Sequence, residues 1–310
     1  MATDGHEQVD HPWRAPGEWL RCALHAHTTQ SDGELAPALL VEHYARAGYD
    51  VLAITDHWRR TDAESSNGLL VVPGAELNCI LPEGRDGHVL AFGIDADPAP
   101  LGREYADLAR TADWIGEHGG VAYLAHPYWT GAATALELPP NVAGIEVYNA
   151  GCELEVGRGL SSVHWDELLE RGRSCFAIAT DDSHHPGFDS DQAWTWVRAP
   201  ERSQDAVLAA LASGSFYGST GPLFYDVVVA DGAVEVSCSA ARSVTLLTGK
   251  TTGAAVNAGR LGYRYAADVL EQSAEGGITR ARLRVPTVAP YGRVEIVDLQ
   301  GRKAWTNPLW

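Results

Sequence analysis

From Trp19 to Ser213 the chain alternates short apolar runs with amphipathic stretches. Apolar runs bounded by turn residues are typical of parallel strands that are buried on both faces. They predict strands at 19–25, 51–55, 69–72, 88–94, 121–125, 144–148, 175–180 and 193–198. The amphipathic stretches predict helices at 35–47, 102–118, 163–171 and 203–213. Because strands and helices alternate, we expect an α/β fold with a mainly parallel sheet.

The pattern changes near Pro222. Beyond it, short segments of alternating apolar and polar residues are separated by turns such as Asp231-Gly232. They predict strands at 225–230, 234–239, 244–248, 281–285 and 293–298. The organisation we expect is therefore a flexible lead-in at 1–17, a large domain at 18–221, and a small antiparallel β domain of the sandwich type at 222–310.

Residue types suited to divalent metals recur where the predicted strands end. His25 and His27 are two residues apart on a strand, so their side chains point the same way. Asp182 and His184 repeat that spacing. The full set of candidate ligands is His25, His27, Asp32, His57, Glu76, His88, His126, Asp182 and His184. Only a closed ring of strands lets so many strand ends face one centre, which favours a barrel with its chemistry at the C-terminal mouth.

These residues stand in motifs that resemble those of the PHP (polymerase and histidinol phosphatase) family. The motifs are His25-Ala26-His27 with Ser31-Asp32-Gly33, Ile54-Thr55-Asp56-His57, Pro73-Gly74-Ala75-Glu76, Gly87-His88, Ala125-His126-Pro127 and Asp182-Ser183-His184. They cover about residues 20–185 in the family order. The segments 144–149 and 218–222 are most similar to stand-alone PHP metal-dependent phosphoesterases and to carbaryl-hydrolase-like metallohydrolases.

The resemblance implies a distorted (β/α) barrel that holds a cluster of three metal ions. It implies that one ion is held by His25, His27, Glu76 and Asp182. A second ion would be held by Glu76, His88 and His126, and a third by Asp32, His57 and His184. The pair Asp181-Asp182 leaves a second register open, in which Asp181 is the ligand. The small β domain is not part of the core family pattern.

A metal-dependent hydrolase is the function that this set of residues predicts. A water shared by two divalent ions loses a proton near neutral pH and becomes the nucleophile, so no protein nucleophile is needed. The candidate catalytic residues are Glu76, Asp182, His184 and His185, the last as a non-ligand acid or substrate contact. Arg158, Tyr148 and His164 are candidate substrate contacts, because each follows a predicted strand or opens the next helix.

The sequence does not determine which metal is bound or which type of bond is cleaved. Mixed imidazole and carboxylate ligands suit zinc, manganese or iron. The leading hypothesis is a phosphoesterase acting on a small phosphate ester or nucleotide. The same metal site would serve a carbamate, ester or amide hydrolase, and a non-catalytic PHP module is the third hypothesis.

Composition narrows the range of partners. A formal net charge of −18 over 310 residues disfavours binding of long nucleic acid or of an anionic membrane surface, which leaves a small-molecule substrate. The N-terminal residues 1–17 lack the apolar core of a signal peptide, and no apolar run reaches membrane-spanning length. Five scattered cysteines without a Cys-x-x-Cys pair predict no disulfide framework. We therefore expect a cytoplasmic protein.

Overall fold

The computed structural model describes residues 12–98, 106–259 and 262–310. The chain divides into two compact units: a larger unit at Pro16–Gly218, and a smaller unit made of Ser219–Trp310 together with the N-terminal segment up to Ala15. Most of the predicted lead-in lies outside the described residues. Within the smaller unit, Trp13 meets the ring of Phe224 edge-on, with 5.8 Å between the ring centroids.

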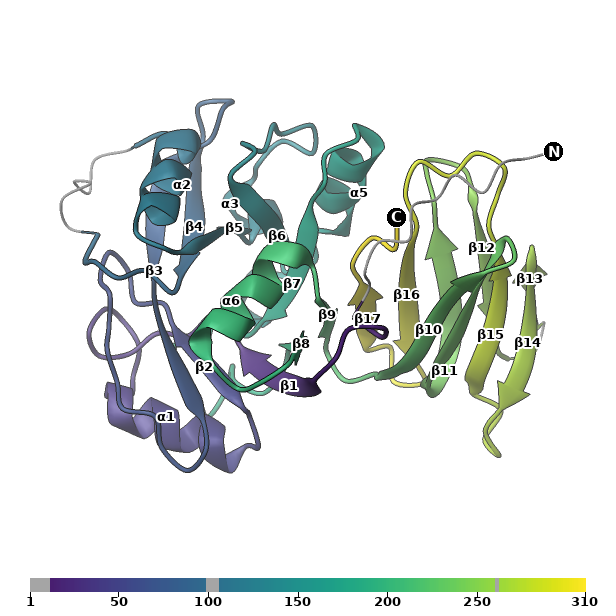
Figure 1. Ribbon diagram of the computed structural model, residues 1–310, viewed down its shortest axis with the longest axis horizontal. Helices are drawn as coiled ribbons and strands as arrows, with labels where there is room; N and C mark the ends of the chain where they lie inside the picture. The colour runs from purple at the N-terminus through teal and green to yellow at the C-terminus, as the bar shows by residue number, and fades with distance from the viewer. Residues whose placement is uncertain (1–11, 99–105, 260–261) are drawn as a thin grey trace. The chain divides into compact units, whose positions relative to one another are not determined.

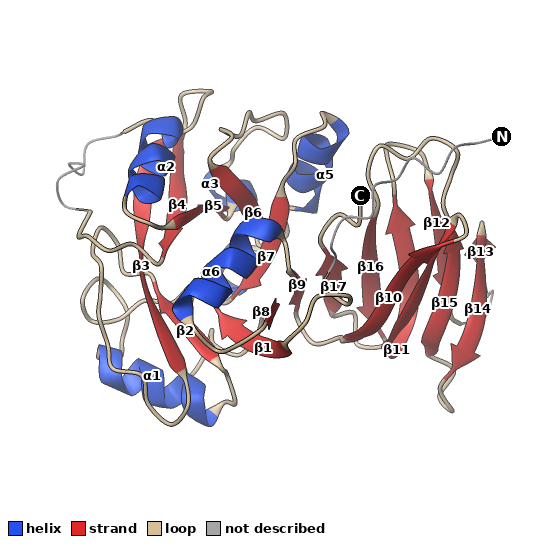
Figure 2. Ribbon diagram, in the orientation of Figure 1, coloured by secondary structure: helices blue, strands red, loops and turns tan. Residues whose placement is uncertain are grey.

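The larger unit is a mixed α/β structure, and it holds all the helices of the described residues (Figure 2). Its strands are β1 (Glu18–Ala23), β2 (Val51–Ile54), β3 (Leu70–Ile80), β4 (Asp86–Phe92), β5 (Val121–Ala125), β6 (Val142–Asn149), β7 (Phe176–Thr180), β8 (Trp194–Ala199) and β9 (Phe216–Ser219). Its helices are α1 (Pro37–Arg46), α2 (Leu108–Glu117), α3 (Pro127–Thr130), α4 (Ala150–Val156), α5 (Ser162–Glu170) and α6 (Gln204–Ser213).

The sheet of the larger unit is buried on both faces. Strand β1 pairs parallel with β2, and β2 with β3; β5 pairs parallel with β6, and β6 with β7. On β2, Val51 and Ala53 join the core cluster that includes Leu211 of α6, whereas Leu52 and Ile54 pack with α1 (Figure 1). Apolar residues on both faces explain the continuous apolar runs of the sequence.

The predicted strand ends were wrong at two ligand-bearing segments. The strand predicted at 19–25 ends at Ala23, so His25 and His27 follow β1 and do not lie on it. Strand β3 does not end before Glu76 but continues to Ile80, and β4 follows through a hairpin as its antiparallel neighbour. Glu76 therefore lies inside β3, and His88 lies near the start of β4. The cause is a change of partner: β3 pairs with β2 only as far as Pro73, and from Gly74 it pairs with β4. No helix stands between β3 and β4, so the predicted alternation fails there.

Two short helices, α3 and α4, were not predicted. Residues 150–156, shortly before Arg158, form α4. The Asn149 side chain caps the start of α4 by accepting a hydrogen bond from the backbone N–H of Cys152. Gly157 ends the helix in a left-handed conformation at φ 69°. Helix α2 begins at Leu108, and the start predicted for it at 102 lies outside the described residues.

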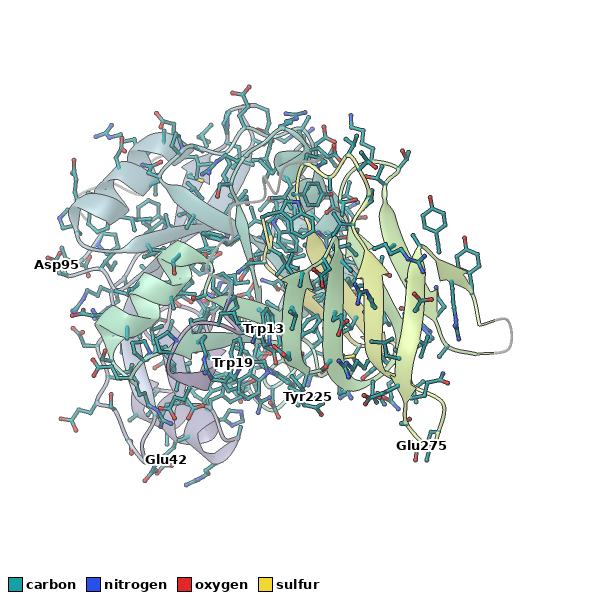
Figure 3. All side chains as sticks on the ribbon, turned by 45° about the vertical axis from the view of Figure 1, so that its right-hand side comes forward. Trp13, Trp19, Glu42, Asp95, Tyr225 and Glu275 are labelled. Carbon is teal, nitrogen blue, oxygen red and sulfur yellow. The ribbon has the colours of Figure 1, made fainter. Side chains whose placement is uncertain are left out.

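The smaller unit contains β strands but no helix among its described residues. The strands are β10 (Phe224–Ala230), β11 (Ala233–Leu247), β12 (Gly253–Asn257), β13 (Arg264–Tyr265), β14 (Ala267–Gln272), β15 (Ile278–Arg284), β16 (Arg293–Asp298) and β17 (Lys303–Thr306). All of the pairings within this unit are antiparallel where they are described. Glu275 lies at the tip of the hairpin that joins β14 to β15 (Figure 3).

Strand β11 belongs to two groups of strands. Its first half pairs with β10 and β15, and its second half pairs with β12 and β16. The pairing register shifts between Ser237 and Ala241, where the strand passes from one group to the other. The two strands predicted at 234–239 and 244–248 are therefore one strand with an irregular middle.

The described part of the chain has no helix that is both long enough and apolar enough to cross a membrane. All five cysteines are buried and free.

Candidate metal centre

The nine predicted metal ligands come together at one place in the larger unit. Four overlapping groups place their ligand atoms within 4.8 Å of one another. The groups are His27, Asp32, His57 and His184; His25, His27, Glu76 and Asp182; Glu76, His88 and His126; and His126, Cys152 and Asp182. The first three contain all nine residues, and they match the grouping that the family resemblance implies except that His27 also joins Asp32, His57 and His184.

Backbone pairing brings these distant segments together. Ala26 forms a parallel bridge with Ser183, so the turn after β1 lies beside the turn after β7. His57 forms a parallel bridge with Glu76, which joins the turn after β2 to the middle of β3. His88 is paired with Ala125, next to His126. Neighbouring strands of one sheet therefore set the ligand positions.

Glu76 is the central residue of the cluster and is almost fully buried. Its Oε1 lies 2.7 Å from His88 Nδ1 and 3.1 Å from His126 Nε2. Its Oε2 lies 3.2 Å from His25 Nε2, and it lies 3.3 Å from both His27 Nε2 and His57 Nδ1. The two oxygens of one carboxylate thus face two separate sets of imidazoles.

Asp182 completes the set around His25 and His27. Its Oδ1 lies 3.1 Å from His25 Nε2 and 3.2 Å from His27 Nε2. Asp181 points elsewhere: its carboxylate accepts hydrogen bonds from Tyr44 Oη and from the backbone N–H groups of residues 191–193. The geometry therefore favours Asp182 over Asp181 as the ligand candidate.

Asp32 lies at the most exposed part of the cluster. Its carboxylate oxygens lie 3.6 Å from His27 Nδ1, 3.6 Å from His57 Nε2 and 3.5 Å from His184 Nε2. The Asp32 side chain is 55% exposed, whereas His25 and His27 are fully buried. The cluster thus runs from a buried end at His25 to an open end at Asp32.

The donor atoms fit divalent cations. Imidazole nitrogens and carboxylate oxygens are the preferred ligands of zinc, manganese and iron in proteins. Burial of each ionisable group costs free energy, because the group loses its contact with water. Packing of the core alone therefore does not explain why so many of them are buried together. Bound cations would hold these carboxylates and imidazoles together.

Charge interactions shift the pKa values of the cluster. Burial lowers the pKa of His27, but hydrogen bonds to Asp182 and Glu76 raise it overall to about 9. Burial raises the pKa of Glu76, but the charges of His25 and His88 bring it well below its usual range. A protonated imidazole cannot bind a metal, so protons and cations compete for these nitrogens.

Glu146 supports the ligands, and sequence reasoning missed it. It is fully buried, and its carboxylate accepts hydrogen bonds from His25 Nδ1 at 2.7 Å and from the backbone N–H of His126 at 2.8 Å. Thr180 Oγ1 and Asn149 Nδ2 donate the other two bonds. Because Glu146 only accepts, His25 carries its hydrogen on Nδ1 and keeps Nε2 available for a metal. The one available signal was a carboxylate in the middle of the apolar run of β6.

A second buried carboxylate, Asp56, fixes the turn that carries Asp32. It accepts hydrogen bonds from the backbone N–H and hydroxyl of Thr28, both at 2.7 Å, and from the hydroxyl of Ser31 at 2.7 Å. Thr61 Oγ1 donates a further bond at 2.6 Å. Asp189 does the same for the turn after β7, where it accepts from the backbone N–H groups of His184 and His185.

Two ligand candidates have unusual backbone conformations. His126 has φ 26° and Asp182 has φ 55°, in the region that non-glycine residues rarely adopt. Such conformations persist only where the surrounding structure holds them, and they concentrate at functional sites. Here the His126 ring faces Glu76, and the Asp182 carboxylate faces His25 and His27.

Gly33 lies against the backbone of a ligand. A Cβ atom at this position would stand 2.2 Å from the carbonyl oxygen of His27. We expect Gly33→Ala to displace the His27 segment, to lower the metal content of the purified protein and to cost about 1–3 kcal/mol of unfolding free energy. Elemental analysis and denaturant unfolding measure both effects. Gly116→Ala in α2 is the control, because a Cβ there meets nothing within 4 Å, and it should leave the metal content unchanged.

The cluster opens into a cavity of about 330 Å³. His185, with a side chain 67% exposed, belongs to the cavity wall, and its Nδ1 lies 3.5 Å from Glu34 Oε2. The wall also contains Trp129, whose ring centroid lies 5.0 Å from that of His126. Trp129 was not predicted as a site residue.

The three predicted substrate contacts do not belong to the wall of this cavity. The exposed Arg158 has its guanidinium 5.6 Å from the ring centroid of Tyr128. His164 is buried, and its Nε2 donates to the carbonyl oxygen of Ala132 at 3.0 Å. Tyr148 forms a bridge with Leu160, and burial raises its pKa to about 12.

Comparison with known proteins gives matches over short segments and over nearly the whole chain. No protein-family model matches the sequence. The 5'-3' exoribonuclease Rnm of Salmonella typhimurium is 36% identical over 85 residues, which are 24% of this chain and 29% of that protein. The Rnm protein of Escherichia coli is 35% identical over 80 residues, which are 23% of this chain and 27% of that protein. The matched segments thus span less than a third of the exoribonucleases' own length.

One match over nearly the whole chain is a solved structure. It is a two-domain protein from Bacteroides vulgatus that contains a predicted PHP-like metal-dependent phosphoesterase. The TM-score is 0.54 at 17% sequence identity, and the alignment covers 96% of each chain. This chain therefore has the fold of the PHP-like metal-dependent phosphoesterases. At this level of identity the likeness concerns the fold, and the activity is argued from the residues of the site.

Proposed function

We propose that this protein is a metal-dependent hydrolase, and specifically a phosphoesterase that acts on a small phosphate ester or nucleotide. One observation carries the proposal: the two oxygens of the buried Glu76 face two different sets of histidines. A carboxylate in that position is suited to bridging two cations, and paired cations are widely used to cleave phosphate esters. In the full proposal, three divalent cations occupy the first three groups; His27 is common to two of these groups, and Glu76 is common to two.

The residues of the chain have distinct tasks in this proposal. Divalent cations bound there would activate water and offset negative charge on the substrate. Glu76 and Asp182 supply the negative charge that retains the cations. Glu146 fixes the tautomer and orientation of His25. His185, exposed on the cavity wall, is the proposed proton donor or substrate contact.

We further propose that the sheet of the larger unit closes into a distorted barrel between β7 and β8. At this seam the hydroxyl of Thr195 accepts a hydrogen bond from the backbone N–H of Ala179 at 3.1 Å and donates one to its carbonyl oxygen at 3.0 Å. A ring of strands would hold the ligand-bearing turns around one centre.

A carbamate, ester or amide hydrolase is the second candidate function. It is favoured by the composition of the cavity wall, which contains no Lys or Arg among the described residues. Arg158, the residue that favoured an anionic substrate, lies outside this wall. The same cations would attack a carbonyl or a phosphoryl centre.

A substrate panel separates the two candidates. The protein is to be loaded with zinc, manganese or iron and assayed on phosphate monoesters, phosphate diesters and a 1-naphthyl carbamate. We expect turnover of phosphate esters that depends on the metal and disappears with a chelator. Turnover of the carbamate alone would make the second candidate correct. A fully metal-loaded protein that cleaves none of these compounds would contradict both proposals.

Long RNA is not expected to be a good substrate, although the partial relatives are exoribonucleases. The net charge of −18 repels a polyanion, and the part of the cavity wall that the structure describes contains no Lys or Arg. The panel therefore includes a long RNA at physiological ionic strength. Efficient cleavage of this RNA would show that the small-substrate proposal is wrong.

A further inference from the structure

Large apolar side chains stand at the cavity in addition to the metal-type residues. Trp129 of α3, Leu154 of α4 and Phe188, in the segment after β7, all line it. They are 37%, 46% and 67% exposed, respectively. Each follows a different strand, and Trp129 and Phe188 come shortly after the ligand candidates His126 and His184 in the sequence. We call these three residues the apolar rim.

Contact between the apolar rim and water is unfavourable, so a ligand that covers the rim would gain free energy. Phe188 and Leu154 are partly exposed, so they forgo part of the free energy that burial of their apolar surface would provide. Binding pockets for small molecules are lined by apolar and aromatic residues around a few polar groups, and the cavity volume of about 330 Å³ is within the usual range. The rim therefore offers contact area for an apolar part of a ligand.

The charge of the wall restricts the ligand further. Asp32, Glu155 and Asp189 belong to the wall, and no Lys or Arg does among the described residues. Only cations bound at the ligand cluster would offset the negative charge of a phosphate group in this cavity. A second or third phosphate extending away from the cluster would meet acidic and apolar side chains, and it would pay a desolvation cost without a partner.

We propose that the site selects phosphate esters with a single phosphate and a flat apolar ring on the alcohol side. This inference rests on the proposed phosphoesterase function and specifies its substrate class. The phosphate binds at the cluster, and the ring packs against Phe188, Leu154 and Trp129. Phe188 and Leu154 are the specificity-determining residues of this proposal, because both are exposed in the wall and neither belongs to a group of ligand candidates.

Paired substrates and paired variants test the inference. We expect the metal-loaded protein to hydrolyse benzyl phosphate, which has an alkyl leaving group like that of glycerol phosphate, with a kcat/KM at least about 10-fold above that of glycerol phosphate. Phe188→Ala should lower kcat/KM for benzyl phosphate about 10-fold, mainly through KM, and change the value for glycerol phosphate by less than about twofold. A nucleoside triphosphate should be a poorer substrate than the corresponding monophosphate.

Val156→Ala is the matched control. Val156 is 60% exposed at the end of the same helix as Leu154, but it does not line the cavity. Leu154→Ala should resemble Phe188→Ala, and Val156→Ala should resemble the unchanged protein. Equal effects of Phe188→Ala on both substrates, or no preference between the substrates, would overturn the inference while leaving the phosphoesterase proposal intact.

A binding measurement keeps the two proposals separate if turnover is absent. Calorimetry with the metal-loaded protein compares benzylphosphonate with methylphosphonate, neither of which is hydrolysed. Tighter binding of benzylphosphonate that Phe188→Ala removes would support the apolar rim as a ligand surface even without phosphoesterase activity. Equal binding of the two phosphonates would contradict it.

Discussion

The Glu76→Gln variant is expected to lose hydrolytic activity by at least about 100-fold, together with most of its bound metal. The amide keeps the size of the side chain but removes its negative charge. In the native protein this charge faces five imidazoles within 3.3 Å. Without it, the ligand set binds cations less tightly, and the bridging position between the two sets of histidines is lost. Elemental analysis and the phosphate-ester assay, made on the same preparation, measure both losses.

Glu155→Gln is the control for this variant. Glu155 also lines the cavity, but it belongs to none of the four ligand groups. It should leave the metal content unchanged. If Glu76→Gln retained full metal content and activity, the proposed centre would be wrong.

Chelation of the unchanged protein tests the same centre without a mutation. A ligand that binds only the native state at 1,000 times its dissociation constant adds about 4 kcal/mol of stability. Removal of the metal should therefore lower the midpoint of thermal unfolding by about 8–16 °C for a domain of this size. Adding the metal back should restore the midpoint. A midpoint that does not change when the chelator is added would contradict a bound metal cluster.

The second large effect is expected for Glu146→Gln. Glu146 lies in none of the ligand groups, yet its carboxylate accepts four hydrogen bonds, including one from the His25 ring. An amide can accept only at its oxygen, so part of this support is lost and the His25 ring is free to change tautomer. We expect the affinity for metal to fall about 10–100-fold. A metal titration followed by calorimetry measures the change.

Two observations distinguish this positioning role from general damage to the fold. Excess metal should restore most of the activity of Glu146→Gln, because the ligands themselves are intact. Glu153→Gln is the matched control: Glu153 also accepts a backbone hydrogen bond, from Gly159 at 2.9 Å, but it does not touch a ligand. If Glu146→Gln left the metal affinity unchanged, Glu146 would not be a positioning residue of the metal centre.

The ligand candidates could be predicted from the sequence because of where they stand in it. His25 and His27, or Asp182 and His184, stand in short turns after apolar runs, where packing does not call for titratable side chains. Glu146 was not readable in this way, because it lies inside a buried strand and its partners come from other strands. The same holds for Phe188, whose place in the cavity wall depends on a turn held by Asp189.

The sequence alone determined the α/β class of the larger unit, the change to β structure after it, and the set of residues suited to metals. These depend on local periodicity and residue type, which are properties of neighbouring positions. Only the tertiary structure decided that β3 runs on past Glu76, that Asp182 rather than Asp181 faces the histidines, and that Arg158 lies outside the cavity wall. Strand partners and side-chain directions depend on contacts between segments far apart in the chain, and no local pattern specifies them.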